Sequence, residues 1–389
     1  MGHIRERPRG SGSRQIIYDL PRTADGKRVQ KSKTIHGTKT QAKKELARIE
    51  QEIDLGTYCQ PTKMNLADYL DKWLRDYAKL NVNPKTYEEY ERIIKTNIVP
   101  SLGNIPLSKL RPLHLQEYYT EMCERGSKIG RGGLSKKTVL NHHVLLRNAL
   151  NRAVEWMLIV SNPADRVKPP TPDRHEMNTI GDKDLGILLQ AAEGTRLYIP
   201  ILIAISTGMR RGEIVALTWA DLDFENGSLR VDKAYGETKS GIFLKPPKTR
   251  SGNRSIALPA TVIDLLRNHK REQAKLRLRI GPDYQNHDLI CPLDDGSPYP
   301  PDRLSRHFAD FVAGLGMPHI TYHELRHSLA TMLTNKKVNP KITSERLGHS
   351  DVRFTMFQYV HSTPEIQREA AELIDDYLQN ALHQAQEGY

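Results

Sequence analysis

Five short motifs between positions 207 and 359 carry side chains suited to handling a phosphate group. They are Thr207–Glu213 (Thr-Gly-Met-Arg-Arg-Gly-Glu), Pro247–Arg254, His323–His327 (His-Glu-Leu-Arg-His), Leu347–His349 and Thr355–Tyr359. The second motif contains Lys248, which its turn-forming neighbours place at a hairpin tip. In the third, His323 and Arg326 are three residues apart and so share one helix face. Guanidinium forks bind two phosphate oxygens at once, and histidines exchange protons near neutral pH, so the series favours phosphate chemistry.

Each motif by itself also fits an ordinary structural role. Arg210 and Glu213 could form an ion pair within one helical turn, and Lys248 could be a solvated lysine of a turn. His349 follows a glycine and could close a helix, while Tyr359 could be a half-buried core tyrosine. Single motifs of this kind are structural more often than catalytic, so the inference depends on their occurring together and in this order.

The third motif is also a literal His-Glu-x-x-His, which is the signature of zinc metallopeptidases. Glu345 follows His327 at a spacing that suits a third zinc ligand. A zinc metallopeptidase is therefore an alternative. It leaves unexplained four residues of the other motifs, and it sets an arginine next to a divalent cation. The four are Arg210, Lys248, His349 and Tyr359.

The charge of the chain is concentrated at its beginning. The net charge is +12, from 58 Lys+Arg against 46 Asp+Glu over 389 residues. Residues 1–44 hold twelve basic and three acidic residues, so nine of the twelve excess charges lie in this segment. A local basic block of this kind indicates a polyanionic partner, most often nucleic acid.

Other features exclude several classes of protein. The three cysteines, Cys59, Cys123 and Cys291, are far apart, which fits a reducing compartment and provides neither a disulfide framework nor a cysteine zinc site. The longest apolar stretch, residues 197–205, is far short of the roughly 20 residues of a membrane helix. No apolar segment follows the basic N-terminus, as it would in a secretion signal. We expect a cytoplasmic protein without membrane contact.

Hydrophobic periodicity divides the chain into three parts. Residues 1–57 are predicted to form three short strands (4–7, 15–20 and 28–35) and a helix (40–53), a layout that suits insertion of a sheet into a DNA groove. Residues 64–163 have a helical pattern throughout, with one helix ending at Pro100. Residues 175–389 mix helices with a short sheet. Helices are expected there at 185–193, 198–207, 302–316, 324–335, 341–347 and 364–386, and strands at 229–234 and 255–258.

Taken in order, the motifs resemble those of the tyrosine recombinases, the phage integrase family. The resemblance implies a multidomain, mainly α fold. Its parts would be an N-terminal three-stranded β plus helix module that binds arm sites, a helical SAM-like core-binding domain, and a mixed α+β catalytic domain with a C-terminal helix at 364–386. The Ile-Val-Pro-Ser-Leu-Gly segment at 98–103 agrees with the second part.

The resemblance also assigns roles residue by residue. Tyr359 would be the nucleophile, Arg210 and Arg326 the phosphate clamps, and Lys248 the hairpin lysine. The paired active-site histidines would be His323 and His349, with Glu213 supporting the first arginine. His327 would be a recurrent but non-catalytic histidine. A tyrosine hydroxyl has an ordinary pKa of about 10, so the nucleophile needs the proton acceptor and the cationic field that these neighbours supply.

The implied reaction is site-specific cutting and rejoining of DNA through a 3′-phosphotyrosine and a Holliday junction, which integrates and excises a mobile element. It needs no metal, ATP or other cofactor. The expected partners are double-stranded attachment sites (core and arm), a homotetramer on DNA, and an excisionase and a DNA-bending host factor. A catalytically silent DNA-binding regulator is a further alternative, but it would have no need of Tyr359. A type IB topoisomerase would lack the extra basic module.

Basic residues in the first two parts are expected to contact DNA. They are Arg5, Arg7, Arg14, Lys27, Arg28, Lys31 and Lys33 in the first part, and Lys85, Lys136 and Lys137 in the second. The helix at 364–386 could pack on its own domain or dock onto a neighbouring protomer.

Overall fold

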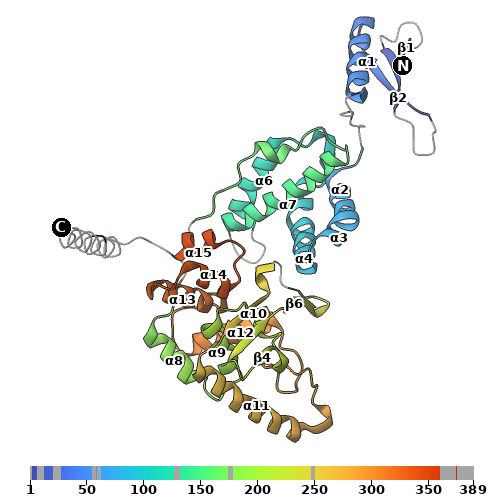
Figure 1. Cartoon of the computed structure of the whole chain (residues 1–389). Helices are drawn as coiled ribbons and strands as arrows, with labels where there is room; N and C mark the ends of the chain where they lie inside the picture. The colour runs from blue at the N-terminus through green and yellow to red at the C-terminus, as the bar shows by residue number, and fades with distance from the viewer. Residues whose placement is uncertain are drawn as a thin grey trace, which may run out of the picture. The chain divides into compact units, whose positions relative to one another are not determined.

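The structure, a computed structural model, describes residues 2–6, 13–20, 28–54, 58, 63–126, 132–173, 178–246, 250–359 and 374. The chain divides into two compact units, Met1–Arg174 and His175–Tyr389 (Figure 1). The first unit contains two separate apolar cores, one in its β-rich start and one in its helical remainder. The helix predicted at 364–386 lies almost wholly outside the described residues. No helix in the described parts is both long enough and apolar enough to cross a membrane.

The N-terminal module is a three-stranded antiparallel sheet with one helix on it. Its elements are β1 (His3–Glu6), β2 (Ser13–Leu20), β3 (Val29–His36) and α1 (Lys39–Asp54), with the strands in the order β1-β2-β3. Alternate residues of the central strand, Ile16, Tyr18 and Leu20, are buried with Ala42 and Ile49 of the helix. Because strand side chains alternate between faces, the other face of the sheet is left open. The predicted strands and helix are confirmed.

The remainder of the first unit is helical, as predicted. Its main helices are α2 (Leu66–Trp73), α4 (Pro84–Ile93), α6 (Pro112–Arg125) and α7 (Lys136–Glu155). Side chains of Asn65, Asn83 and Ser135 accept hydrogen bonds from the first turns of three of these helices. The short elements η1 (Leu74–Ala78), α3 (Lys79–Asn81), η3 (Leu107–Lys109) and η4 (Pro163–Arg166) complete the segment.

The prediction that a helix ends at Pro100 is wrong. After α4 the chain continues as a π-helical turn, η2 (Ile94–Ile98), and then as α5 (Val99–Leu102). The backbone N–H of Val99 bonds to the carbonyl of Ile94, five residues back. Pro100 therefore lies in the first turn of a new α-helical segment, where a missing N–H costs little.

Two tyrosine–histidine pairs join α6 to α7 inside this helical core. The Tyr118 hydroxyl lies 2.9 Å from His142 Nδ1, and the Tyr119 hydroxyl lies 3.0 Å from His143 Nδ1. His142 is 1% exposed, and its Nε2 has no partner among the described residues. Burial, aided by the charge of Arg92, lowers the pKa of His142 to about 4.

We expect His142 to make folding sensitive to acid. Below about pH 6.5 the unfolded chain protonates this ring and the folded chain does not. The free energy of unfolding therefore falls as the pH is lowered from there toward 4, by about 1.4 kcal/mol per pH unit. His142→Gln keeps an acceptor for Tyr118 but cannot titrate. Urea unfolding at pH 7 and pH 4.5 should show that the unfolding free energy decreases less between the two pH values for this variant than for the wild type. Exposed His287→Gln is the control, and equal losses in all three proteins would contradict the prediction.

The second unit packs helices around an apolar central helix and two small strand groups. Its helices are α8 (Asp182–Ala192), α9 (Tyr198–Thr207), α10 (Arg211–Ile214), α11 (Ala260–Ile280), α12 (Pro301–Gly314), α13 (Tyr322–Asn335), α14 (Pro340–Leu347) and α15 (Val352–Tyr359). Helix α9 is buried along most of its length, and α13, α14 and α15 pack on one another (Figure 1). The predicted helices of the described part are confirmed, whereas α11 and α15 were not predicted.

The two predicted strands of this unit are found and pair with each other, but the segment between them forms a second ribbon that no pattern predicted. One sheet has the order β4-β5-β8, from β4 (Leu222–Asp223), β5 (Ser228–Val231) and β8 (Arg254–Ala257), and a separate ribbon pairs β6 (Ala234–Thr238) with β7 (Gly241–Lys245). Because β7 and β8 are not partners, the connection that contains Lys248 links two strand groups and is not a simple hairpin. Lys248 itself lies outside the described residues.

Candidate active site

The first part of the site is a tight turn at the end of α9. Gly208 has a left-handed backbone (φ 68°), which ends the helix and leads the chain to Arg210 at the start of α10. The carbonyl of Gly208 accepts a 2.6 Å hydrogen bond from Arg326 of α13. Arg326 is 2% exposed. The turn after α9 therefore binds Arg326 through the Gly208 carbonyl, and it places Arg210 two residues further along the chain.

Arg210 is held by a buried carboxylate. Its backbone N–H and its Nη1 donate to the two carboxylate oxygens of Glu213, at 3.0 and 2.9 Å, and its Nη2 donates to the carbonyl of Gly348 at 3.1 Å. The Glu213 side chain is 5% exposed, whereas that of Arg210 is 46% exposed. The arginine is thus fixed at one side and open to solvent at the other, as a group that binds an external anion must be.

A second arginine, to which no sequence pattern gave a role, binds the same carboxylate. Arg254 Nη2 donates to Glu213 Oε2 at 2.9 Å, and the Arg254 side chain is 7% exposed. Burial acts to raise the pKa of Glu213, but the guanidinium groups, Arg254 first, hold it below its ordinary value. Arg254 closes the Pro247–Arg254 motif and begins β8. An arginine directly before the predicted strand 255–258 is the signal that could have found it.

Three histidines lie close to the two arginines. The rings of His323 and His327 meet edge to face at 4.6 Å between centroids. His349 Nδ1 lies 2.8 Å from the hydroxyl of Thr355, which is buried in α15. Burial and the charges of Arg326 and Arg210 lower the pKa of His323, and the same causes lower the pKa of His349 to about 4. At neutral pH both imidazoles are therefore uncharged, with a ring nitrogen available to accept a proton.

The Glu324 carboxylate of the His-Glu-x-x-His motif is engaged in capping its own helix. It accepts a 2.5 Å hydrogen bond from the backbone N–H of Thr321, the capping residue just before α13. Within the described ranges, no three histidine, cysteine or carboxylate side chains come together in a group that could hold a metal ion. The three ligands that a zinc metallopeptidase requires are therefore not brought together in the described residues, and these residues do not fit that alternative.

The remaining predicted catalytic residues are placed only in part. Tyr359 is the last residue of α15, one helical turn beyond Thr355, which touches His349. Its side chain and Lys248 lie outside what the structure describes. The structure brings together Arg210, Glu213, His323, Arg326 and His349, and it sets the backbone of Tyr359 nearby through α15.

The predicted DNA-binding residues fall into three groups. Arg7 and Lys27 lie outside the described residues. Arg14, Arg28 and Lys33 bind Gly37 O, Asp19 and Glu45 respectively, and Lys136 binds Asp173. Arg5, Lys31, Lys85 and Lys137 have exposed side chains.

The comparisons with known proteins agree with this geometry. Residues 178–366 match the model of the phage integrase family, and residues 65–123 match that of the phage integrase N-terminal SAM-like domain. The chain belongs to the phage integrase family. It is a tyrosine recombinase, and enzymes of this family cut and rejoin DNA.

Relatives of this recombinase resemble it over most of its length. The tyrosine recombinase XerC-like protein of Caldanaerobacter subterraneus subsp. tengcongensis is 27% identical over 382 residues, covering 93% of this chain and 95% of that protein. The ICEBs1 integrase of Bacillus subtilis (strain 168) is 25% identical over 303 residues, covering 77% of this chain and 80% of the relative.

Solved structures show the same fold. The Tn1549 transposon integrase in complex with transposon right end DNA has a TM-score of 0.69 at 24% identity, covering 80% of this chain and 100% of that one. A lambda integrase tetramer bound to a Holliday junction has a TM-score of 0.54 at 18% identity, covering 93% and 100%. The predicted multidomain, mainly α fold of an integrase is confirmed.

Gly208→Ala should damage both stability and the site. A Cβ at this position would lie 2.5 Å from Leu347 Cδ2 and 3.1 Å from Leu329 Cδ2, in a left-handed backbone. We expect a loss of about 2–4 kcal/mol of unfolding free energy, and slower DNA cleavage because the carbonyl that binds Arg326 must move. Gly194→Ala is the matched control, because Gly194 also has positive φ (75°) but open space around it. Its expected loss is about 1 kcal/mol. Equal losses in urea unfolding would contradict this account of Gly208.

Proposed function

We propose that this recombinase cleaves one DNA strand with Tyr359, at a phosphate held by Arg210 and Arg326. The observation that carries the proposal is the convergence of these two arginines with His323 and His349 around one site, next to the helix that ends in Tyr359. The arginines stabilise the charge that grows on the non-bridging oxygens. The histidines are uncharged before DNA binds, so one of them can accept the tyrosine proton.

The covalent step conserves the energy of the broken bond. The Tyr359 oxygen forms a bond to phosphorus, the bond from phosphorus to the 5′ oxygen breaks, and Lys248 supplies the proton that the 5′ oxygen takes up. Attack by a 5′ hydroxyl on the 3′-phosphotyrosine reverses these steps and releases the tyrosine. Rejoining then needs no ATP, and exchange of the attacking strand yields a Holliday junction.

Tyr359→Phe should abolish the covalent complex and retain DNA binding. A nicked duplex from the junction of the mobile element, labelled upstream of the cleaved phosphate, should give the wild-type protein a covalent adduct on denaturing gels, in EDTA as in its absence. The variant should give none, because phenylalanine has no hydroxyl to attack, while gel shift of the same duplex persists. An adduct formed by the variant would overturn the proposal, as would an EDTA-sensitive peptidase activity of the wild type.

We infer three functional parts: an arm-site module at 1–57, a core-binding domain at 64–163 and the catalytic domain at 175–389. Support for the core-binding part comes from Lys136 and Lys137. They lie in the first turn of α7, where the helix dipole disfavours positive charge unless an anion such as a phosphate is bound. Exposed Lys85 lies in the first turn of α4 in the same way.

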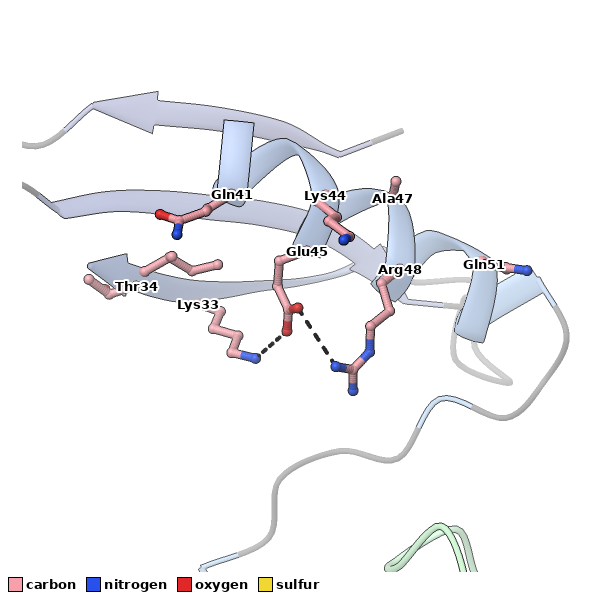
Figure 2. A pocket seen from close by; sticks show the side chains of 9 residues that line it. Lys33, Thr34, Gln41, Lys44, Glu45, Ala47, Arg48 and Gln51 are labelled. Carbon is pink, nitrogen blue, oxygen red and sulfur yellow. Dashed lines mark hydrogen bonds and ion pairs between the residues drawn. The ribbon is translucent and has the colours of Figure 1, made fainter. Parts of the chain in front are cut away.

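The strand register of the N-terminal module indicates which side chains would meet DNA. Lys33 and Lys31 of β3 are opposite Ile16 and Tyr18, so they lie on the side of the sheet that α1 covers. Figure 2 shows Lys33 and Arg48 on either side of Glu45 in the groove between β3 and α1.

The open face of the sheet has a different composition. Arg5, Gln15 and Thr34 are opposite one another across the three strands, and Gln15 donates a 2.8 Å hydrogen bond to Ser32 beside them. Amide and hydroxyl groups of this kind match the hydrogen-bonding edges of bases in the major groove. We propose that this face, and not the lysines of β3, carries sequence recognition at arm sites.

The double variant Arg5→Ala/Gln15→Ala should weaken recombination on full-length attachment sites and spare cleavage of isolated core sites. The expected loss of arm-site affinity is about 30-fold or more, because each of the two lost contacts to bases costs about 1–3 kcal/mol. Lys33→Ala is the control from the α1 side and should bind arm DNA nearly as the wild type does. Deletion of residues 1–62 should reproduce the recombination defect. The proposal fails if the double variant recombines full-length sites at the wild-type rate.

We also propose assembly as a homotetramer on DNA, by analogy with the lambda integrase tetramer bound to a Holliday junction. Integration and excision of a mobile element in the cytoplasm, with an excisionase and a DNA-bending host factor, complete the proposal. Relatives such as the ICEBs1 integrase and the transposase from transposon Tn916 support the mobile-element role. The helix expected at 364–386 remains a candidate for docking between protomers.

A further inference from the structure

The buried carboxylate of Glu213 binds two guanidinium groups that differ in exposure. Arg210 binds one oxygen through Nη1 and the other through its backbone N–H, while Arg254 binds through Nη2. Arg254 and Glu213 are almost fully buried, and Arg210 is about half exposed. The group of three has a net charge of +1, and Arg210 carries the solvent-facing part of it.

The charge balance would be different without Arg254. Glu213 and Arg210 alone would form a neutral ion pair, and a buried carboxylate with one partner binds that partner strongly. A phosphate would then have to compete with Glu213 for the same guanidinium. We propose that Arg254 is a positioning residue that neutralises Glu213, so that Glu213 orients Arg210 without cancelling the positive charge that binds the scissile phosphate. This inference rests on the proposed role of Arg210.

Contacts on its other nitrogens keep Arg254 in this role. Its Nε donates to the carbonyl of Arg346 at 2.8 Å, and its Nη1 donates to the carbonyl of Gly252 at 3.1 Å. Gly348 lies so close that a Cβ there would be 2.8 Å from Arg254 Nη1 and 3.0 Å from Cζ. The guanidinium is therefore surrounded and cannot turn toward DNA as a third clamp.

The same contacts connect separate catalytic segments. Arg254 joins β8 to the end of α14 through Arg346, and Arg210 joins α10 to the next turn through Gly348, the residue before His349. The Glu213 carboxylate links the two arginines, because it accepts a hydrogen bond from each guanidinium group. Lysine at position 254 would keep the positive charge beside Glu213 but has no planar fork to reach all three acceptors.

The test compares Arg254→Met, Glu213→Gln and the double variant. Single-turnover cleavage of nicked core-site DNA is measured at saturating protein and well below the unfolding temperature, so that a loss of stability alone does not lower the rate. We expect Arg254→Met to slow cleavage about 100-fold, at the low end of losses for removing one transition-state donor. Adding Glu213→Gln removes the carboxylate charge that would compete with the phosphate for Arg210, and the amide keeps an oxygen that accepts a hydrogen bond from Arg210. The double variant should therefore cleave about tenfold faster than Arg254→Met.

A purely structural role for Arg254 gives different results. Wild-type cleavage by Arg254→Met would overturn the proposal, and so would a double variant as slow as Arg254→Met or slower. If Arg254→Met does not fold, Arg254→Lys decides: it should cleave within about tenfold of the wild type, and a loss of about 100-fold would contradict charge compensation. Lys233→Met is the control, because it removes a cation 2.7 Å from a different buried carboxylate, Asp221, and not from Glu213. Failure of the proposed function would show separately, as a covalent adduct formed by Tyr359→Phe.

Discussion

The candidate active site depends on one buried carboxylate bound between two arginines. Taking Glu213 out of water is costly, and the cost is offset only because Arg210 and Arg254 bind it together. This requirement sets the distance between the start of α10 and the start of β8, since both must deliver a guanidinium to the same group. Through the backbone contacts of the two arginines it also sets the end of α14, and with it His349.

The arginines in turn determine the state of the histidines. Without a bound anion, the positive charges of Arg326 and Arg210 act with burial to lower the pKa of His323 and His349. A phosphate placed between these groups adds negative charge, which favours the protonated imidazole. In the proposed reaction, DNA binding would therefore move the histidine pKa in the direction that helps a ring accept the tyrosine proton. The substrate itself would make the site a better base than it is in the free protein, where burial and the arginines keep both histidines neutral.

The sequence predicts best what local spacing encodes. Helix α9 has the predicted bounds, 198–207, and the three-residue spacing of His323 and Arg326 brings both to the site. Arg254 could not be found in this way, because its role arises from contacts with Glu213, which is 41 positions away in the sequence, and with Arg346, which is 92 positions away. The same holds for the ribbon of β6 and β7, which no pattern predicted and which separates the two predicted strands, β5 and β8, although these pair with each other. The prediction at Pro100 was wrong for another reason, since a π-turn shifts the backbone bonding so that Pro100 lies in the first turn of a helical segment that begins at Val99.

Net charge was the first indication of DNA binding, but the structure changes what it means for the N-terminal module. Arg28 binds Asp19, which the excess of residues 1–44 already counts, and Lys33 binds Glu45, which it does not. Residues 45–57 add four acidic side chains and one basic, so the module 1–57 has 13 basic and 7 acidic residues and a net charge of +6. The open face of its sheet presents amides and hydroxyls together with Arg5. Because phosphate contacts supply affinity and base contacts supply specificity, such a face suits reading of sequence more than general attraction to DNA. The charge excess of the segment therefore overstates its electrostatic contribution, and recognition depends on how the strand register distributes side chains between the two faces.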